Sequence, residues 1–312
     1  MRLSTCSVLL ALCSTAEAAD SPYVPPRLDN GQPDMQGVWV ASNSTPLERP
    51  PGFTTLVIDE AQAAKLLASM DARAEDRSRP AEPTEYFDPL SIERTRGELR
   101  SSIIVDPPDG LIPGNDLYKQ HFAQAMASVL NAMDGPEQRP APERCLGSQT
   151  TQPPILSIRN GVNLHQIVQT SDSFVFTSEF VNTARIVRLS PKRMPSTVTS
   201  WLGDSIGRWE GDTLVVETRS FTPSDHFRVG ISGNFLVSPR TVVTEYFVRV
   251  AADRLDYTFK VEDPTYYTQP WTGESHFLRR DEQVLEYACH EANYSLIHIL
   301  EGARERERRG QQ

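Results

Sequence analysis

The second half of this chain alternates apolar and polar residues with a period of two, most clearly in segment 254–262. The odd-numbered residues of that segment are apolar: Leu255, Tyr257, Phe259 and Val261. The even-numbered residues are polar or charged: Asp256, Thr258, Lys260 and Glu262. Successive side chains of a strand point to opposite faces, so one face of this strand contacts a core and the other contacts water. That division is typical of an antiparallel sheet.

Similar runs follow one another from Ile155 onward, separated by short turns rich in Asn, Asp, Gly and Pro. They predict strands at 155–159, 164–169, 173–180, 184–189, 205–209, 213–219, 241–250, 254–262, 273–279 and 283–289. A meander of many strands avoids exposed edges when it closes on itself. We therefore expect a mainly β protein with minor α, built on an antiparallel, lipocalin-like β-barrel. A β-sandwich is the alternative.

The first half of the chain has a different composition. Its first residues, up to about 53, are rich in proline and are expected to run extended along a surface, apart from a strand at 37–41. Segment 59–62 has the form of a capping box and predicts a helix that continues to about residue 73. A strand at 102–105 and a helix over 115–133 follow. Residues 19–150 are thus expected to wrap a barrel formed by 151–290.

The last segment, from about 291 to 308, predicts a helix because its apolar residues form one stripe at helical spacing. The stripe consists of Ala292, Leu296, Ile299, Leu300 and Ala303. We expect this helix, within residues 291–312, to cover one end of the barrel. Residues 19–312 then form a single domain.

Residues 1–18 have the features of a secretory signal peptide. Arg2 precedes an apolar stretch of about a dozen residues, and Ala16-Glu17-Ala18 matches the A-x-A cleavage pattern. The apolar stretch is too short for a membrane span, which needs about 20 residues. The sequence therefore predicts a periplasmic or secreted protein that is cleaved near Ala19 and has no transmembrane segment.

The chain contains four cysteines, of which Cys6 and Cys13 lie in the predicted signal peptide. Cys13 leaves a lipid anchor open as an alternative, although Leu12 is larger than the residue that usually precedes a lipidated cysteine. The remaining pair, Cys145 and Cys289, predicts a disulfide in an oxidising compartment. On the chain-entropy model, a loop of this length makes such a bond worth about 4–5 kcal/mol. Two buried thiols are the alternative.

Charge and motifs exclude several classes of function. The net charge is −10 and no stripe of Lys and Arg is present, which argues against a nucleic-acid partner. The chain lacks a dinucleotide fingerprint, a P-loop, a haem-attachment motif and an EF-hand loop, so we predict no cofactor. His290-Glu291 resembles the start of a zinc-protease helix, but Tyr294 occupies the position of the second histidine, so no metal site is predicted. Gly203-Asp204-Ser205 lacks the late Asp-x-x-His pair of lipases with a similar triplet.

Five segments, taken in order, resemble a large family of uncharacterised exported bacterial proteins. They lie at 33–50, 104–110, 201–218, 263–272 and 286–304. The most specific are Trp201-Leu-Gly-Asp-Ser-Ile-Gly-Arg-Trp-Glu-Gly-Asp-Thr-Leu-Val-Val-Glu-Thr218 and Glu286-Tyr-Ala-Cys-His-Glu-Ala-Asn-Tyr294. Segment 190–195 departs from the family, whose members usually have a Gly-Arg-Pro-His-Pro-like run there. The resemblance implies export and supplies no catalytic residues.

Segment 201–218 predicts a tight β-hairpin with Gly211 in its turn. Its aromatic and charged side chains are our candidates for the rim of a pocket, where aromatic rings stack on a ring-bearing ligand. The candidates for substrate binding are Trp201, Asp204, Arg208, Trp209 and, from a later segment, Trp271. The alternative is a structural corner in which the tryptophans close one barrel end and Arg208 pairs with a carboxylate.

Acid–base catalysis needs histidines and carboxylates that converge. The candidates are His290, His276, His226, Glu245, Glu274 and Tyr294. His290 and Tyr294 lie four residues apart beside Cys289, so a helix that begins here places them on one face. Glu274 shares a strand face with His276 and can orient its ring. Helix capping, core packing and ion pairing are the structural alternatives for these residues.

Three classes of function remain open. The first hypothesis is a cofactor-free enzyme (a lyase, isomerase or hydrolase) that acts on an apolar or aromatic small molecule in the barrel pocket by His/carboxylate chemistry. The alternatives are a periplasmic small-molecule binding protein and a non-catalytic envelope interaction protein. A pocket with a His–carboxylate contact favours the enzyme, and an apolar and aromatic lining favours the binding protein. A filled barrel with an exposed apolar patch favours the interaction protein.

Overall fold

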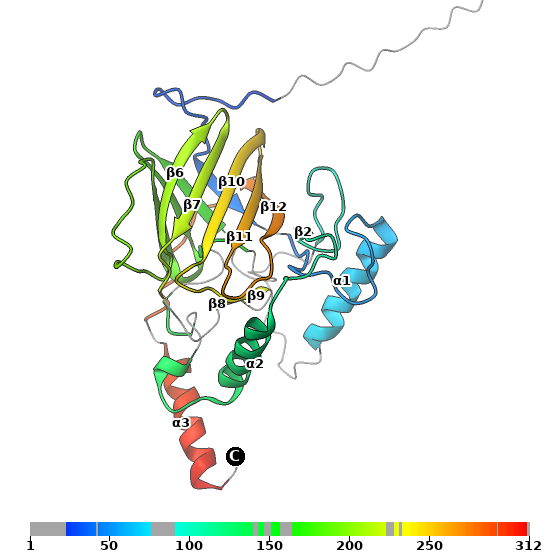
Figure 1. Cartoon of the computed structure of the whole chain (residues 1–312), viewed down its shortest axis with the longest axis vertical. Helices are drawn as coiled ribbons and strands as arrows, with labels where there is room; N and C mark the ends of the chain where they lie inside the picture. Colours follow the sequence, from blue (N-terminus) through cyan, green and yellow to red (C-terminus); the bar gives the residue numbers. More distant parts are fainter. Residues whose placement is uncertain are drawn as a thin grey trace, which may run out of the picture.

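The computed structural model describes residues 23–41, 43–75, 91–139, 143–146, 151–156, 164–222, 228–230, 233–291 and 293–310. Within these ranges nine strands close into a β-barrel, so the predicted mainly β, lipocalin-like fold is confirmed (Figure 1). In spatial order the strands are β1 (Gly37–Val40), β3 (Leu164–Gln169), β4 (Ser173–Ser178), β5 (Thr183–Arg188), β6 (Asp204–Glu210), β7 (Thr213–Arg219), β10 (Val242–Ala251), β11 (Arg254–Glu262) and β12 (Trp271–Arg280).

The short strand β1 closes the barrel. Trp39 lies opposite His165 of β3 on one side and opposite Arg279 of β12 on the other. The expected strand at 37–41 therefore belongs to the barrel rather than to the surrounding wrap. Along β11, which coincides with the predicted strand at 254–262, buried residues alternate with half-buried ones as the sequence pattern requires.

One pair of neighbouring barrel strands, β5 and β6, is parallel, whereas the other neighbours are antiparallel. The parallel pairing is short: Val187 lies opposite Ser205, and Arg188 lies opposite Ile206. The barrel is thus mixed rather than purely antiparallel. A parallel pair needs a crossover connection instead of a tight turn, and residues 189–203 provide it.

The predicted strand at 283–289 is wrong, because these residues form no strand. β12 already pairs with β11 on one side and with β1 and β2 (Ile104–Asp106) on the other, which leaves no free edge. Leu285 and Tyr287 are exposed instead. Of the predicted strand at 155–159, Ile155 and Leu156 are buried without strand pairing, and 157–159 lie outside the described residues. A separate two-stranded sheet pairs β8 (Arg228–Gly230) with β9 (Gly233–Phe235).

Bulky aromatic side chains fill the interior of the barrel. The fully buried ones are Trp39, Phe174, Phe176, Phe247, Tyr257, Phe259, Trp271 and Phe277. The rings of Phe247 and Tyr257 are 4.9 Å apart, and those of Phe259 and Trp271 meet edge to face at 5.7 Å. Such pairs add to the stabilisation that burial provides. Among the described residues, the middle of the barrel is therefore a packed core.

Two helices of the first half lie outside the barrel, with α2 below it and α1 to the right in Figure 1. α1 (Glu60–Glu75) begins with the predicted capping box. The N–H of Gln62 donates to Asp59 Oδ1 at 2.8 Å, and the N–H of Asp59 donates to Gln62 Oε1 at 3.0 Å. α2 (Asp116–Asn131) is capped by Asn115, whose Oδ1 accepts the N–H of Tyr118 at 2.9 Å. Short 3₁₀ turns occur at Pro136–Gln138 and Phe180–Asn182.

The expectation that the C-terminal helix covers a barrel end is wrong. α3 (Tyr294–Arg308) extends away from the barrel, beyond the far end of α2 (Figure 1). Arg304 Nη2 donates to the backbone oxygen of Asp134 at 2.5 Å, and Ala303 is the one buried residue among the described residues of the helix. Polar contacts with the segment after α2 thus hold α3, because its apolar stripe is short and half-exposed. Among the described helices, none is long and apolar enough to span a membrane.

Candidate functional site

A groove opens in the barrel wall where β5 and β6 separate. The pairing of β5 with β6 ends at Arg188, whereas the pairing of β5 with β4 continues by one residue, because the N–H of Leu189 donates to the backbone oxygen of Asp172 at 2.7 Å. Pro191 has no N–H and so cannot donate a backbone hydrogen bond that would extend the pairing. The two strands therefore part after only two paired positions. This leaves a gap in the wall beside the second half of β6.

We call this gap the Trp209 groove. Its volume is about 370 Å³, and its lining comes from four separate parts of the chain. The lining residues are Gln32, Ser171, Leu189, Ser190, Pro191, Ile206, Gly207, Arg208 and Trp209. Trp209 and Leu189 are half-buried and pack against the barrel core. Gly207 lets Leu189 approach closely, since a Cβ there would lie 3.0 Å from Leu189 Cδ2 and 2.9 Å from Val187 Cγ1.

Two polar atoms of groove-lining residues are buried without a hydrogen-bond partner. Within the described ranges, neither the indole Nε1 of Trp209 nor the side-chain Oε1 of Gln32 makes a hydrogen bond. One is a donor and the other an acceptor. Buried polar groups are usually paired, and leaving one unpaired costs about 1–3 kcal/mol. Both atoms belong to residues that line the Trp209 groove, although neither atom is exposed to solvent.

Charged residues fix the loop that forms one wall of the Trp209 groove. Asp204 accepts hydrogen bonds from Arg188 Nη2 at 2.6 Å and from the N–H of Met194 at 3.1 Å. Arg193 forms an ion pair with Glu217. Burial acts to raise the pKa of Glu217, but Arg219 and Arg193 outweigh it and hold the pKa below its usual value. Asp204 thus positions the groove wall and is not part of the lining.

The predicted substrate-binding residues separate into two groups. Trp209 and Arg208 line the groove, where Arg208 Nη2 is also paired with Glu210 at 2.6 Å. Trp201 lies half-buried in the turn before β6, outside the lining. Trp271 is fully buried in the core, where its ring lies 5.9 Å from that of Phe235. Trp271 packs as part of the barrel interior because β12 directs it inward.

Glu245, a catalytic candidate, lies fully buried inside the barrel. It accepts hydrogen bonds from both terminal nitrogens of Arg185, of which Nη1 lies at 3.0 Å, and from the hydroxyl of Tyr257 at 2.8 Å. Arg185 also donates to Ser205 Oγ at 3.1 Å and to Thr218 Oγ1 at 3.0 Å. Burial, and then the charge of Glu245, raise the pKa of Tyr257 well above its usual value. These residues form one closed network, and it contains no histidine.

Glu274 and His276 share a face of β12, as predicted, but their hydrogen bonds go to different partners. Arg100 Nη1 donates to Glu274 Oε2 at 2.5 Å. His276 Nδ1 lies 3.2 Å from the hydroxyl of Thr95. Burial, and then the charge of Arg254, lower the pKa of His276 to about 3. Both side chains thus attach the segment around 95–100 to the outside of the barrel.

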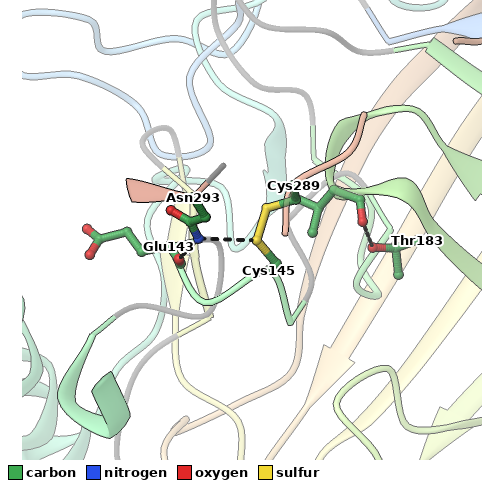
Figure 2. Close-up of a disulfide and its surroundings, with 6 residues drawn as sticks. Glu143, Cys145, Thr183, Cys289 and Asn293 are labelled. Carbon is green, nitrogen blue, oxygen red and sulfur yellow. Dashed lines mark hydrogen bonds between the residues drawn. A yellow bond between two sulfur atoms is a disulfide. The ribbon is translucent and has the colours of Figure 1, made fainter. Parts of the chain in front are cut away.

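His290 and Tyr294 are exposed, and neither lines the Trp209 groove. His290 precedes α3, so it shares no helical face with Tyr294, whose side chain is exposed. The neighbouring Cys289 forms a disulfide with Cys145, with Sγ atoms 2.05 Å apart (Figure 2). Asn293 lies beside this disulfide and donates to the backbone oxygen of Glu143 at 3.1 Å. The predicted cysteine pairing is confirmed, and His226 lies outside the described residues.

The sequence analysis did not select His165. Its side chain is fully buried between the rings of Phe176 and Phe277, at 4.7 and 5.6 Å. Neither ring nitrogen has a hydrogen-bond partner among the described residues. Burial lowers the pKa of His165 to about 3, so the ring is neutral. The alternation of β3, in which Ile167 and Gln169 are also buried, was the available signal.

Gln32 and the Leu189–Pro191 wall were also not selected, because they lie in loops without a recognisable motif. In the part of the chain that the structure describes, no three or more His, Cys, Asp or Glu residues are arranged to hold a metal ion. No protein-family model matches the chain, and neither does any curated protein, so its resemblance to the exported bacterial family stays a prediction.

Proposed function

We propose that this protein binds a small, largely apolar molecule with an aromatic ring in the Trp209 groove. The observation that carries the proposal is the combination of an apolar lining with a buried, unpaired donor on Trp209 and a buried, unpaired acceptor on Gln32. A ligand that contacts both atoms recovers two hydrogen bonds that the protein alone lacks. The groove volume of about 370 Å³ lies within the range of small-molecule sites.

The groove lies in the wall and not in the centre of the barrel. A central site of the kind that lipocalins use is disfavoured here, because aromatic side chains occupy the interior. The gap between β5 and β6 gives access to the edge of that core without unfolding it. Binding therefore requires movement of groove side chains and no opening of the barrel.

Binding is favoured over acid–base catalysis by the residues that line the groove. They include no histidine, and their one charged member, Arg208, is paired with Glu210. Among the described residues, His298 Nδ1 lies 3.4 Å from Glu301 Oε2 on the exposed surface of α3. The cofactor-free lyase, isomerase or hydrolase thus remains a prediction from the sequence. Its candidate histidines are His290, His276 and His226, of which His226 lies outside the described residues.

We further propose that the protein works in an oxidising compartment outside the cytoplasm. The Cys145–Cys289 disulfide supports this proposal, because such bonds persist mainly in exported proteins. The predicted signal peptide lies outside the described residues. Amino-terminal sequencing of the protein from its native host tests the proposal, since a mature chain that still begins at Met1 contradicts export by cleavage.

Calorimetric titration with 2-naphthol tests the proposed site. We expect binding to the native protein and an increase of about tenfold or more in Kd for Trp209→Leu, because the ring contact and the indole donor are both lost. Trp201→Leu is the matched control, since Trp201 lies outside the groove lining, and it should leave Kd unchanged. Equal affinity of the native protein and the Trp209→Leu variant would contradict the proposal.

A further inference from the structure

A second groove adjoins the Trp209 groove. Its volume is about 390 Å³, and Ser171, in the turn between β3 and β4, lines both grooves. The other lining residues are Arg27, Leu28, Asp29, Asn30, Gln36, Gln169 and Thr170. The segment that contains residues 27–36 contributes to both, with Gln32 in the first groove and its neighbours in the second. We call the second one the Asn30 groove.

The two grooves differ in chemistry. Leucine, isoleucine, proline and tryptophan side chains form much of the Trp209 groove, whereas five of the eight residues that line the Asn30 groove carry an amide or a hydroxyl. Within the described ranges, three of these polar groups have unused hydrogen-bonding atoms. They are Nδ2 of Asn30, Nε2 of Gln36 and Oγ of Ser171, none of which bonds to another described residue.

The charges at the Asn30 groove do not favour an ionic ligand. Arg27 is engaged by Asp212 at the tip of the β6–β7 hairpin, at 2.5 Å, and by the backbone oxygen of Gly31 at 3.1 Å. Asp29 adds a negative charge that repels an anion. Amides and hydroxyls offer both donors and acceptors, which suits ligand hydroxyl groups, because each hydroxyl also donates and accepts.

The floor of the Asn30 groove is held in place by Gln169, whose side chain is more than nine-tenths buried. Its Oε1 accepts the N–H of Met35 at 2.5 Å, and its Nε2 donates to the backbone oxygen of Pro33 at 3.1 Å. The backbone N–H of Gln169 donates to Gln36 Oε1 at 3.3 Å. These bonds fix residues 33–36 against β3, so the groove is formed before any ligand arrives. Preorganisation of this kind lowers the entropic cost of binding.

We infer that the ligand is an uncharged aromatic compound with a hydroxylated extension, of the aryl glycoside type. The inference rests on the proposed function: the ring lies in the Trp209 groove and the hydroxylated part extends past Ser171 into the Asn30 groove. The aromatic end supplies most of the apolar burial, and the hydroxyls supply specificity through Asn30 and Gln36.

Phenol and phenyl β-D-glucoside are the probes for this inference, with Kd measured by calorimetry. We expect the glucoside to bind the native protein about tenfold more tightly than phenol, because its hydroxyls add hydrogen bonds. The test variant is Asn30→Asp/Gln36→Glu. Each substitution keeps the oxygen that accepts an existing backbone N–H and replaces only the unused amide nitrogen. In this variant the advantage of the glucoside should fall to about threefold or less, while the Kd of phenol stays the same.

Gln166→Glu provides a matched control, because Gln166 lies exposed on β3 and lines neither groove. It should leave both affinities unchanged. Equal binding of phenol and the glucoside to the native protein overturns the inference, as does tighter binding of phenyl phosphate than of the glucoside. In either case, weaker phenol binding by Trp209→Leu than by the native protein would still support the proposed binding of an aromatic ring in the Trp209 groove. Phenol binding that Trp209→Leu does not weaken contradicts the proposed function itself.

Discussion

Arg185 and Glu245 form an ion pair inside the barrel, where their side chains are 3% and 0% exposed. Both carboxylate oxygens of Glu245 accept hydrogen bonds from Arg185. The guanidinium of Arg185 also donates to the hydroxyls of Ser205 on β6 and Thr218 on β7. A charge in a low-dielectric interior is tolerated only when it is paired and hydrogen-bonded in this way. The pair links β5 to β10 across the interior, so it specifies how the barrel walls face one another.

Glu245→Gln should destabilise the fold by about 3–5 kcal/mol, because it leaves the charge of Arg185 buried without a counter-charge. Urea denaturation monitored by circular dichroism measures the change. Glu210→Gln, which breaks the exposed pair with Arg208, is the control and should cost at most about 1 kcal/mol. Similar losses in the two variants would mean that the buried pair is not a stabilising element.

Stability should decrease as the pH falls from about 6.5 towards 3. His165 and His276 have pKa values of about 3 in the folded chain, because burial disfavours their charged form. In the unfolded chain their pKa returns to about 6.5, so the unfolded state binds more protons between these values. Their stabilising contribution is therefore fully present above pH 6.5 and is lost as the pH falls through that interval.

The slope of the unfolding free energy against pH measures this effect. Two such histidines contribute up to about 2.7 kcal/mol per pH unit, and His276→Gln should remove about half of that. The His298→Gln variant serves as the control, because that side chain is 71% exposed. An identical slope for the native protein and His276→Gln would exclude His276 as a source of acid sensitivity.

Cys145→Ser should lower the melting temperature under oxidising conditions, because the disulfide closes a loop between residues 144 positions apart. For that length the chain-entropy model gives about 4–5 kcal/mol. Affinity for 2-naphthol should stay the same, since Thr183 near the disulfide and Ser171 of the groove lie at opposite ends of the β4–β5 hairpin. A reductant should lower the melting temperature of the native protein and leave that of the variant unchanged. The same melting temperature for both proteins without reductant would count against this role.

Gly273→Ala should destabilise the barrel by about 1–3 kcal/mol through overpacking. A Cβ at this position of β12 would lie 2.3 Å from Cζ of Phe259, whose ring covers the glycine. Gly302→Ala is the matched substitution, and it should stabilise the protein instead. No atom lies within 4 Å of its Cβ, and alanine favours a helix over glycine by about 1 kcal/mol. Relative to the native protein, the melting temperature should therefore fall in Gly273→Ala and rise in Gly302→Ala.

Local pattern predicted most of the barrel. β11 and β7 occupy the predicted ranges. In an antiparallel, half-buried strand, apolar and polar residues alternate along consecutive positions, so a short stretch of sequence is enough to identify it. The failed strand at 283–289 has a similar pattern. Pairing, however, depends on a free sheet edge, and β1 and β2 already occupy the one beside β12. That competition between distant segments is not visible in any short window of sequence.

The candidate site was predictable only in part. Trp209 and Arg208 were selected because they stand in a conspicuous hairpin, yet the groove also needs Gln32 and Pro191 from other regions. Trp271 has the same chemistry as Trp209, but strand direction places it in the core. Residue type thus indicated which side chains can bind a ring, whereas their positions relative to the core depend on the whole barrel.

The closure of the barrel by β1 has a consequence for the order of folding. β1, which contains Trp39, pairs with β3 on one side and with residues 278–280 of β12 on the other. A chain that emerges with its amino terminus first cannot complete the barrel before Arg280 has emerged. Folding then depends on a contact of very high sequence separation, which slows it.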